Sequence, residues 1–532
     1  MHGRYALEPV AATVAGIHDH DARLGDFSAQ GFAERDRFVD EWLGKLEPLV
    51  ESELFPSERV DRALILSELR GDRALRDFAR WRRQPTLYSD AVTRGAYYAF
   101  LREHAPLAER VATLAERLAE APGVIGDAKR NLDPDLVPRE WIDVALRSVP
   151  AGAVFLRETA PTLLVPTTSL ERAAARGFGP AAEAAARALD EYAAWLRDDL
   201  QPKARGTFAI GSDAVDAWLR EKELVDHDAA SLRAWGDELV RETESALAEA
   251  ALELGFQDWR TAVAGMREDH PAEDDLVAVY RQEMERSRLA VATAQIATIP
   301  YGEDLVVEEM PAFQRPTYPY AAYVGAAPFE SQRKGRFWVN RPAADEDEKT
   351  RRERLEGHPR AGISVIACHE GYPGHHLQLT VAADNPSLAR KALRSNLMVE
   401  GWGLYVEELM TDLGYLDAPT TRLLRLKDLL WRAARVIVDV GLSTGEMSFD
   451  EAVAYMVERP KLEPTNALGE VRRYTLNPLQ PSSYALGRAA ILGLRDRAKA
   501  AGWGMRVFHD RLLAAGSLPP KLLARELGLD AA

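Results

Sequence analysis

Residues 231–255 read SLRAWGDELVRETESALAEAALELG, and this stretch decides the fold class. Apolar residues recur three and four positions apart with charged residues between them, which is the period of an amphipathic helix. Two other segments have the same pattern, RVATLAERLAEA at 110–121 and PAAEAAARALDEYAAWLRDDL at 180–200. Pro and Gly stand between such segments and mark their ends. The sequence therefore predicts a mainly α protein.

One region, from Asp304 to Arg341, breaks the helical pattern. It is rich in β-branched and aromatic residues and contains repeated prolines, and three short alternating segments in it predict a small sheet of about three strands. The segments are DLVVEEM (304–310), YAAYVGA (320–326) and GRFWVN (335–340). Around this sheet we expect two helical lobes enclosing a deep cleft. The predicted parts are an N-terminal helical lobe (1–205), connecting long helices (206–303), the small sheet (304–341) and a C-terminal helical lobe (342–532).

The composition excludes several classes of protein. The 532 residues carry 67 basic and 83 acidic side chains, a net charge of −16, and no basic face that would bind nucleic acid or an anionic membrane. No apolar run is long enough for a signal peptide or a membrane span. The single cysteine, Cys368, allows no intrachain disulfide and favours a reducing compartment. These features predict a cytoplasmic protein without nucleic-acid or membrane partners, and they leave the oligomeric state open.

The residues that carry chemistry follow the apolar run AGISVIAC (361–368). Three of the eleven histidines fall within eight positions in HEGYPGHH (369–376). A His-Glu pair at the end of such a run is typical of H-E-x-x-H zinc hydrolases, in which two histidines one helical turn apart bind zinc and the glutamate acts as general base. Here Pro373 stands where the second histidine would be. The spacing therefore needs another explanation.

On a straight helix neither remaining histidine meets His369. His375 lies about 240° round the axis, and His376 lies in phase but roughly 10 Å further along. Zinc needs donor atoms only about 3.4 Å apart. Pro373-Gly374 can supply a kink or bulge that closes this gap, because proline breaks a helical hydrogen bond and glycine tolerates unusual backbone angles. We favour His375 as the second ligand, with His376 supporting the site, facing the substrate, or acting as the ligand in the alternative register.

The third ligand is expected in VEGWGLYVEEL (399–409). Glu400 follows His369 by 31 residues, which suits a helix that returns past the motif. A buried carboxylate is costly unless it is paired or bound to a metal. Glu407 and Glu408 are the alternatives. The predicted ligands of one zinc ion are His369, His375 and Glu400.

HEGYPGHHLQ followed by EGWGLYVEEL resembles the bacterial family known as domain of unknown function 885, whose hallmark is H-E-x-x-P-G-H-H. Similar segments extend over about residues 70–525, including GRFWVN and LLWRAARVIVDVGL (429–442). The resemblance implies a mostly helical, gluzincin-like metallopeptidase related to the helical oligopeptidases and carboxypeptidases. One departure is Ser443, where the family usually has a histidine. If that histidine binds substrate in relatives, specificity here differs.

Roles follow from this chemistry. Glu370 is expected to accept the proton of a metal-bound water and to pass it to the leaving amine. By analogy with helical oligopeptidases, Tyr484 is expected to stabilise the developing oxyanion; packing is the alternative role of this tyrosine. Arg432 and Arg435 lie one helical turn apart and are candidates to hold a substrate carboxylate, with an ion pair to Asp439 as the alternative.

The strand GRFWVN is a candidate edge for pairing with an extended peptide, which would place Arg336 and Asn340 near the cleft. Three functions are consistent with the sequence. The first is a zinc peptidase acting on short peptides. The second is a metal-dependent hydrolase of a small non-peptide amide or ester. The third is an inactive, metal-stabilised binding protein, against which Glu370 argues because a structural site has no use for a base.

Overall fold

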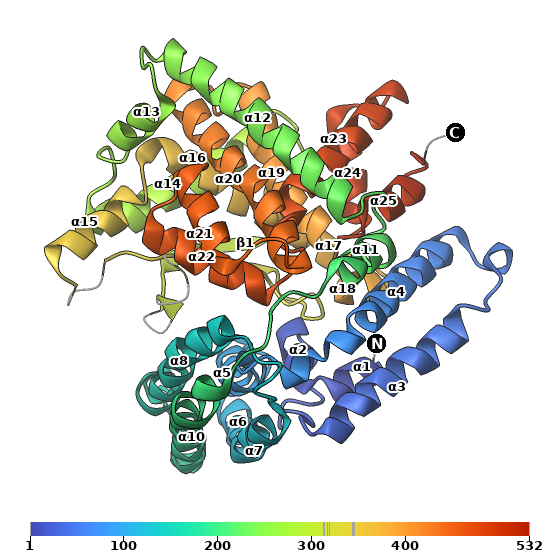
Figure 1. Ribbon diagram of the computed structural model, residues 1–532, viewed down its shortest axis with the longest axis vertical. Helices are drawn as coiled ribbons and strands as arrows, with labels where there is room; N and C mark the ends of the chain where they lie inside the picture. Colours follow the sequence, from blue (N-terminus) through green and yellow to red (C-terminus); the bar gives the residue numbers. More distant parts are fainter. Residues whose placement is uncertain (1, 312–313, 316–317, 319, 343–345, 531–532) are drawn as a thin grey trace. The chain divides into compact units, whose positions relative to one another are not determined.

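A computed structural model describes residues 2–311, 314–315, 318, 320–342 and 346–530 (Figure 1). The protein is mainly α-helical with one small sheet, as predicted. The chain forms two compact units, and we describe each by itself. Unit 1 comprises Met1–Leu49 and Leu69–Ala209, and unit 2 comprises Val50–Glu68 and Ile210–Ala532. Residues 50–68 thus belong to unit 2, although the sequence places them in the N-terminal lobe.

Unit 1 is built around the long helix α10, which packs against α6, α7 and α8. Leu118, Val149 and Leu189 are fully buried between these helices. The helices are α1 (His2–Leu7), α2 (Pro9–Ala15), α3 (Ala29–Leu46), α5 (Thr86–Leu101), α6 (Leu107–Ala119), α7 (Ala121–Asn131), α8 (Arg139–Val154), α9 (Ala160–Thr162) and α10 (Ser169–Trp195), while α4 (Pro56–Ala74) contributes residues to both units.

Unit 2 contains the other helices. The amphipathic stretch at 231–255 forms α12, which lies along α20 (Figure 1). The two helices approach so closely that a Cβ on Gly236 would lie 2.9 Å from the side chain of Val436. The helices are α11 (Ser212–Glu221), α12 (Ala229–Glu253), α13 (Trp259–Met266), α14 (Leu276–Thr293), α15 (Glu348–Glu356), α16 (Arg360–Glu370), α17 (His375–Ala383), α18 (Leu388–Ala392), α19 (Asn396–Asp412), α20 (Pro419–Thr444), α21 (Phe449–Glu458), α22 (Pro464–Leu476), α23 (Ser483–Ala500), α24 (Met505–Ala514) and α25 (Pro520–Glu526).

The sheet has the three predicted strands, β1 (Asp304–Glu309), β2 (Ala321–Val324) and β3 (Lys334–Val339). Their order is β1-β3-β2, with β1 parallel and β2 antiparallel to β3. Phe337 and Val339 are buried against Ile363 of α16 and Tyr280 of α14. The sheet and α14 therefore form the support on which the motif-bearing helix α16 rests.

The prediction that GRFWVN offers a free edge is wrong, because β3 is the central strand and both of its sides are paired. Arg336 forms an ion pair with Glu308 at 2.9 Å. Asn340 is fully buried, and its amide nitrogen donates to the backbone carbonyls of Arg315 and Tyr318. Both side chains have structural partners, and neither lines the cavity described below.

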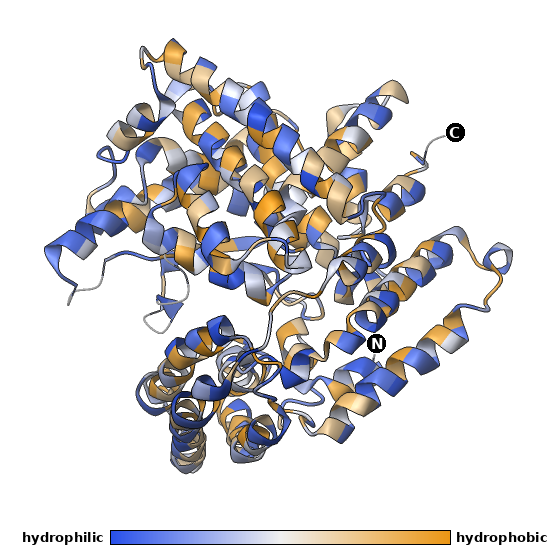
Figure 2. Ribbon diagram, viewed as in Figure 1, coloured by the Kyte–Doolittle hydropathy of each residue, from blue (hydrophilic) through white to orange (hydrophobic). Residues whose placement is uncertain are grey.

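Hydrophobic and hydrophilic residues both occur along nearly every helix, as amphipathic packing requires (Figure 2). Within the described residues, no helix combines the length and the hydropathy that a bilayer-spanning segment needs.

Candidate metal centre

The histidine motif lies at a break between two helices of unit 2. Helix α16 ends at Glu370 and α17 begins at His375, so residues 371–374 interrupt the helix at the position where the sequence predicts a kink or bulge. At Gly374 the backbone folds back so closely on α16 that a Cβ would lie 1.9 Å from the carbonyl oxygen of His369. Only glycine fits this approach. The break therefore brings His375 beside His369.

Three side chains of the motif converge at this break. One ligand atom each from His369, Glu370 and His375 lies within 4.8 Å of the others. Glu400 Oε2 lies 3.4 Å from His375 Nε2, which matches the spacing of about 3.4 Å between donors around tetrahedral zinc. The two imidazole rings are 4.7 Å apart and nearly perpendicular, at 89°. The imidazoles of His369 and His375 and the carboxylate of Glu370 therefore surround one point, and Glu400 lies beside it at His375.

Both histidines are oriented by a partner on Nδ1. His369 Nδ1 lies 2.7 Å from Glu407 Oε1, which leaves Nε2 for a metal. His375 Nδ1 lies 3.5 Å from the amide oxygen of Gln378, whose nitrogen donates to the carbonyl of Met398 at 2.9 Å. Such partners fix the tautomer and ring orientation of metal-binding histidines. The donor set thus fits a zinc ion held through two Nε2 atoms.

Helix α19 supplies both carboxylates from one face. Glu400 and Glu407 are two helical turns apart, so they lie on the same side of the helix. Gly403 lies between them, and a Cβ there would be 2.6 Å from the ring of His369. The imidazole thus packs directly on the helix backbone, and a larger residue at 403 would displace it. This close approach explains the glycine in EGWGLYVEEL.

The two alternatives to Glu400 have other partners. Glu407 supports His369 as described, and Glu408 forms an ion pair with Arg488. Burial by itself would raise the pKa of Glu400, but the hydrogen bond with His375 and the positive charges of His375, His369 and Arg435 together lower that pKa to about 2. Burial likewise lowers the pKa of His375, but the hydrogen bond with Glu400 and the negative charges of Glu370 and Glu400 together raise it to about 9. The geometry therefore favours Glu400 as the carboxylate ligand.

His376 is fully buried and is directed into a separate hydrogen-bond network. Its Nε2 lies 2.7 Å from Glu303 Oε2, and its Nδ1 lies 3.1 Å from the hydroxyl of Tyr323. Glu303 also accepts hydrogen bonds from Arg288, at 3.0 Å, and from Tyr372. Burial raises the pKa of Glu303, but these three partners lower it to about 2. His376 therefore supports the motif loop, and Glu303, which no sequence pattern indicated, holds it there.

A cavity of about 110 Å³ opens beside His369. Six polar residues of its lining matter for the chemistry: His369, Glu370, Asp428, Arg432, Arg435 and Tyr484. Glu370 has no hydrogen bond or ion pair with any described residue, so its carboxylate is available in the cavity. The cavity lies entirely within unit 2. Sequence-predicted residues from three helices, α16, α20 and α23, are therefore brought together here.

Arg435 is held in place from α22. Its Nε donates to the hydroxyl of Tyr474 at 2.9 Å, and its Nη2 donates to Glu470 at 3.2 Å. Its guanidinium also lies 4.7 Å from the ring centre of Tyr484. The alternative partner, Asp439, instead accepts hydrogen bonds from Ser482 and so anchors the start of α23.

Ser443 is not among the cavity-lining residues. Its hydroxyl lies 3.4 Å from the carboxylate of Asp439, in the interior of the unit. Ser443 therefore contributes to the surroundings of Asp439 and not to the cavity wall.

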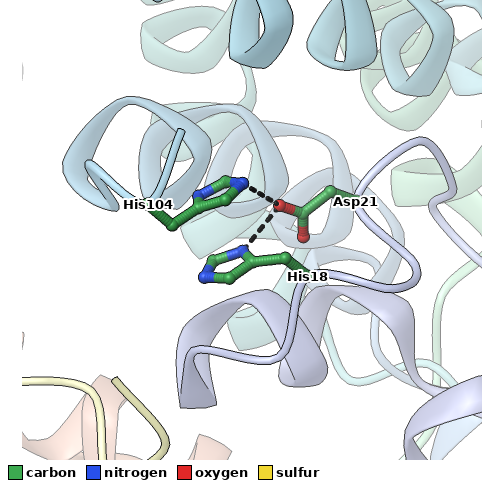
Figure 3. Close-up of side chains that lie close together, drawn as sticks. All are labelled: His18, Asp21 and His104. Carbon is green, nitrogen blue, oxygen red and sulfur yellow. Dashed lines mark hydrogen bonds and ion pairs between the residues drawn. The ribbon is translucent and has the colours of Figure 1, made fainter. Parts of the chain in front are cut away.

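A second cluster, His18, Asp21 and His104, lies in unit 1 (Figure 3). Asp21 Oδ2 is 2.8 Å from His18 Nδ1 and 3.6 Å from His104 Nε2. The two rings are stacked in parallel with centres 3.4 Å apart, so a metal midway between them would lie about 1.7 Å out of each ring plane. Imidazole binds metals through a nitrogen lone pair that lies in the ring plane, at a nitrogen–metal distance of about 2.0–2.1 Å. This cluster is therefore a hydrogen-bonded group around Asp21, which Thr13 and Arg117 also contact.

A family model described as "Bacterial protein of unknown function (DUF885)" matches residues 9–527, almost the whole chain. The protein belongs to this family. Among curated proteins, none matches the chain. Membership therefore confirms the sequence resemblance, and the activity remains to be argued from the site.

Two solved structures share the fold. One, titled a "putative lipoprotein of unknown function" from Shewanella oneidensis, has a TM-score of 0.81 and 22% identity and covers 99% of this chain and 98% of its own. The other, titled a "putative lipoprotein" from Colwellia psychrerythraea, has a TM-score of 0.81 and 18% identity and covers 99% of this chain and 96% of its own. At these identities the similarity establishes the fold of this DUF885 protein.

The cytoplasmic location predicted from the sequence is contradicted by these structures, because lipoproteins are anchored to a membrane or lie outside the cytoplasm. The physical reason for the error is plain. A chain with Cys368 as its single cysteine forms no intrachain disulfide in an oxidising compartment either, so cysteine content did not discriminate between compartments.

Proposed function

We propose that this DUF885 protein is a zinc-dependent hydrolase of gluzincin type that acts on short peptides. The observation that carries the proposal is the arrangement at the helix break. His369 and His375 each have a partner on Nδ1, Glu400 Oε2 lies 3.4 Å from His375 Nε2, and the carboxylate of Glu370, which pairs with no described residue, adjoins the two histidines. A structural site would fill its positions with protein ligands and would not need such a base.

When bound, zinc would polarise the scissile carbonyl and lower the pKa of a bound water towards 7. Glu370 follows His369 directly in the chain and lines the same cavity. In this proposal its carboxylate accepts the proton of the attacking water and donates it to the leaving amine. Glu407 holds the imidazole of His369 through Nδ1 and so keeps its Nε2 in place during this proton transfer.

Tyr484 is the candidate donor to the developing oxyanion. It lines the cavity with Glu370, and its hydroxyl makes no hydrogen bond with a described residue. Burial and the negative charge of Glu400 raise the pKa of Tyr484, so the hydroxyl stays protonated at neutral pH. A protonated donor aimed at the reacting oxygen is what oxyanion stabilisation requires.

The test uses the purified protein loaded with zinc and a peptide library whose products are identified by mass spectrometry. Glu370→Gln should keep the metal and lose roughly 10²- to 10⁴-fold in kcat, because general base catalysis contributes about that factor. Glu356→Gln, on α15 and outside the cavity, is the control and should be fully active. Unchanged turnover in Glu370→Gln would overturn the mechanism, and cleavage of small amides or esters alone would reassign the substrate.

A further inference from the structure

The side of the cavity formed by α20 carries more positive than negative charge. Arg432 and Arg435 line this side with one carboxylate, Asp428, whereas the lining carboxylates Glu370 and Glu407 lie beside the histidines. Asp428 forms ion pairs with Lys427 and Arg432, and Glu470 forms ion pairs with Arg435 and Arg473. Within 4.0 Å these four cations contact no other carboxylate of the described chain. On this side of the cavity, four cations against two carboxylates leave a surplus of two positive charges.

Most of this surplus is shielded from water. The side chains of Lys427 and Arg432 are each 14% exposed, and that of Arg435 is 5% exposed. Burying charge without a counter-ion is costly. The arrangement is therefore complementary to an anion that enters the cavity.

Arg432 has donors to offer such an anion. Its Nη1 donates to the backbone carbonyl of Asp428 at 3.2 Å. Its Nε is buried and has no hydrogen-bond partner among the described residues, and Nη2 makes no hydrogen bond with them either. A guanidinium with free N–H groups on adjacent nitrogens can bind a carboxylate through two parallel hydrogen bonds.

The size of the cavity limits what the anion can belong to. The cavity that Glu370 and the two arginines line has a volume of about 110 Å³. Typical small-molecule sites have volumes of roughly 300–1,000 Å³. A peptide chain that continued on both sides of the scissile bond would need a larger cavity. A single terminal residue, with its scissile bond at Glu370 and its carboxylate at Arg432, is the part of a peptide that suits this space.

We propose that Arg432 binds the C-terminal carboxylate of the substrate, so that the enzyme removes one residue at a time from the carboxyl end of short peptides. Arg435, held by Tyr474 and Glu470, adds its charge behind Arg432. This inference rests on the proposed function and specifies its substrate class. The chemistry is hydrolysis: water adds across the last peptide bond, its proton passes through Glu370 to the leaving nitrogen, and a free amino acid departs.

The first experiment compares three peptides of one sequence, a free acid, a C-terminal amide and an N-acetylated free acid. The two free acids should be cleaved at the last peptide bond with similar kcat/KM. The amide should react about ten- to a hundredfold more slowly, the factor expected when a charge-assisted hydrogen bond is lost. Equal rates for acid and amide, or internal cleavage, would overturn the proposal, and so would a requirement for a free N-terminus.

The second experiment changes the arginine. Arg432→Ala should raise KM for the free acid about ten- to a hundredfold and leave the amide and the zinc content unaffected. Arg333→Ala is the matched control, since Arg333 is 15% exposed, pairs with Asp384 and lies outside the cavity. An equal loss on acid and amide would show that Arg432 acts on the reaction rather than on the carboxylate.

A binding measurement separates this inference from the proposed function. Calorimetry on zinc-loaded Glu370→Gln protein should show N-acetyl-alanine binding at least tenfold more tightly than its amide, and Arg432→Ala should abolish the difference. If no peptide is hydrolysed, the proposed function fails. The difference in affinity between N-acetyl-alanine and its amide still decides whether the carboxylate site exists. Equal binding of acid and amide would refute the site even in an active hydrolase.

Discussion

The two histidine clusters of this protein have the same composition and opposite organisation. Each places two histidines and one carboxylate within 4.8 Å. In unit 2 the rings of His369 and His375 are nearly perpendicular, at 89°, whereas in unit 1 the rings of His18 and His104 are parallel within 8°. Perpendicular rings can direct two lone pairs at one point, and stacked rings cannot.

The clusters also differ in how carboxylates are shared. In unit 1 both histidines compete for one oxygen of Asp21. In unit 2 Glu407 contacts His369 and Glu400 contacts His375, and Glu370 forms no hydrogen bond or ion pair with a described residue. Proximity of ligand-type residues is therefore a poor criterion for a metal centre. Separate orienting partners and an available base distinguish the centre in unit 2.

Removing the metal should have the largest effect and should act on unit 2 alone. A ligand present at about 1,000 times its Kd stabilises the folded state by roughly 4 kcal/mol. Chelation should therefore lower the thermal transition of unit 2 and speed amide hydrogen exchange in α16, α17 and α19. Exchange in α2 and α5 of unit 1 should not change. Equal effects of chelation on both units, or no change in the thermal transition of unit 2, would contradict the claim that unit 2 alone holds the metal.

Glu407→Gln should weaken zinc binding about 10- to 100-fold, because an amide orients His369 less well than a carboxylate does and lowers its basicity. Competition with a chromogenic chelator measures this affinity. Glu408→Gln is the matched control: it is the next residue on α19 and pairs with Arg488 instead. If both variants bind zinc equally, the partner on His369 does not tune the site.

Asp21→Asn should destabilise unit 1 by about 1.5–3 kcal/mol, because Asp21 is the charged acceptor for His18, Thr13 and Arg117. Zinc content should be unaffected. Thermal unfolding and elemental analysis of the same sample provide both readouts. A loss of zinc would show that the unit 1 cluster holds metal after all.

The smallest effect is a pH dependence in unit 1. Burial raises the pKa of Asp21, but the hydrogen bonds from His18 and Thr13 and the positive charges of His18 and Arg117 together keep it below its usual 3.8. A lowered folded-state pKa means that this carboxylate stabilises fully above about pH 4 and progressively less as pH falls through the folded value. The stability difference between wild type and Asp21→Asn should therefore shrink below pH 4. A constant difference would argue against an ionised Asp21.

Local patterns predicted much of this architecture. Helical periodicity marked the segment that forms α12, and alternation marked all three strands. Pro373-Gly374 indicated the break in the helix because those two residue types are incompatible with a continuous one. Each of these features depends on residues close together in the chain.

Features set by distant contacts were missed. The strand order, which makes β3 central, depends on how the chain returns from β2. Glu303 reaches His376 from 73 positions away, and no periodicity reports such a partner. The sequence likewise predicts Glu407 only as an alternative ligand. The choice between Glu407 and Glu400 depends on which part of α19 packs against α16, and this contact cannot be inferred from the sequence.

The most direct test of the central claim is the zinc content of the purified protein and its histidine variants, measured by elemental analysis after dialysis against a weak chelator. We expect one zinc per chain in wild type, in His18→Ala and in His104→Ala, and none in His375→Ala. A wild type without zinc, or a His375→Ala variant that retains zinc while His18→Ala loses it, would show that the motif in unit 2 is not the zinc site.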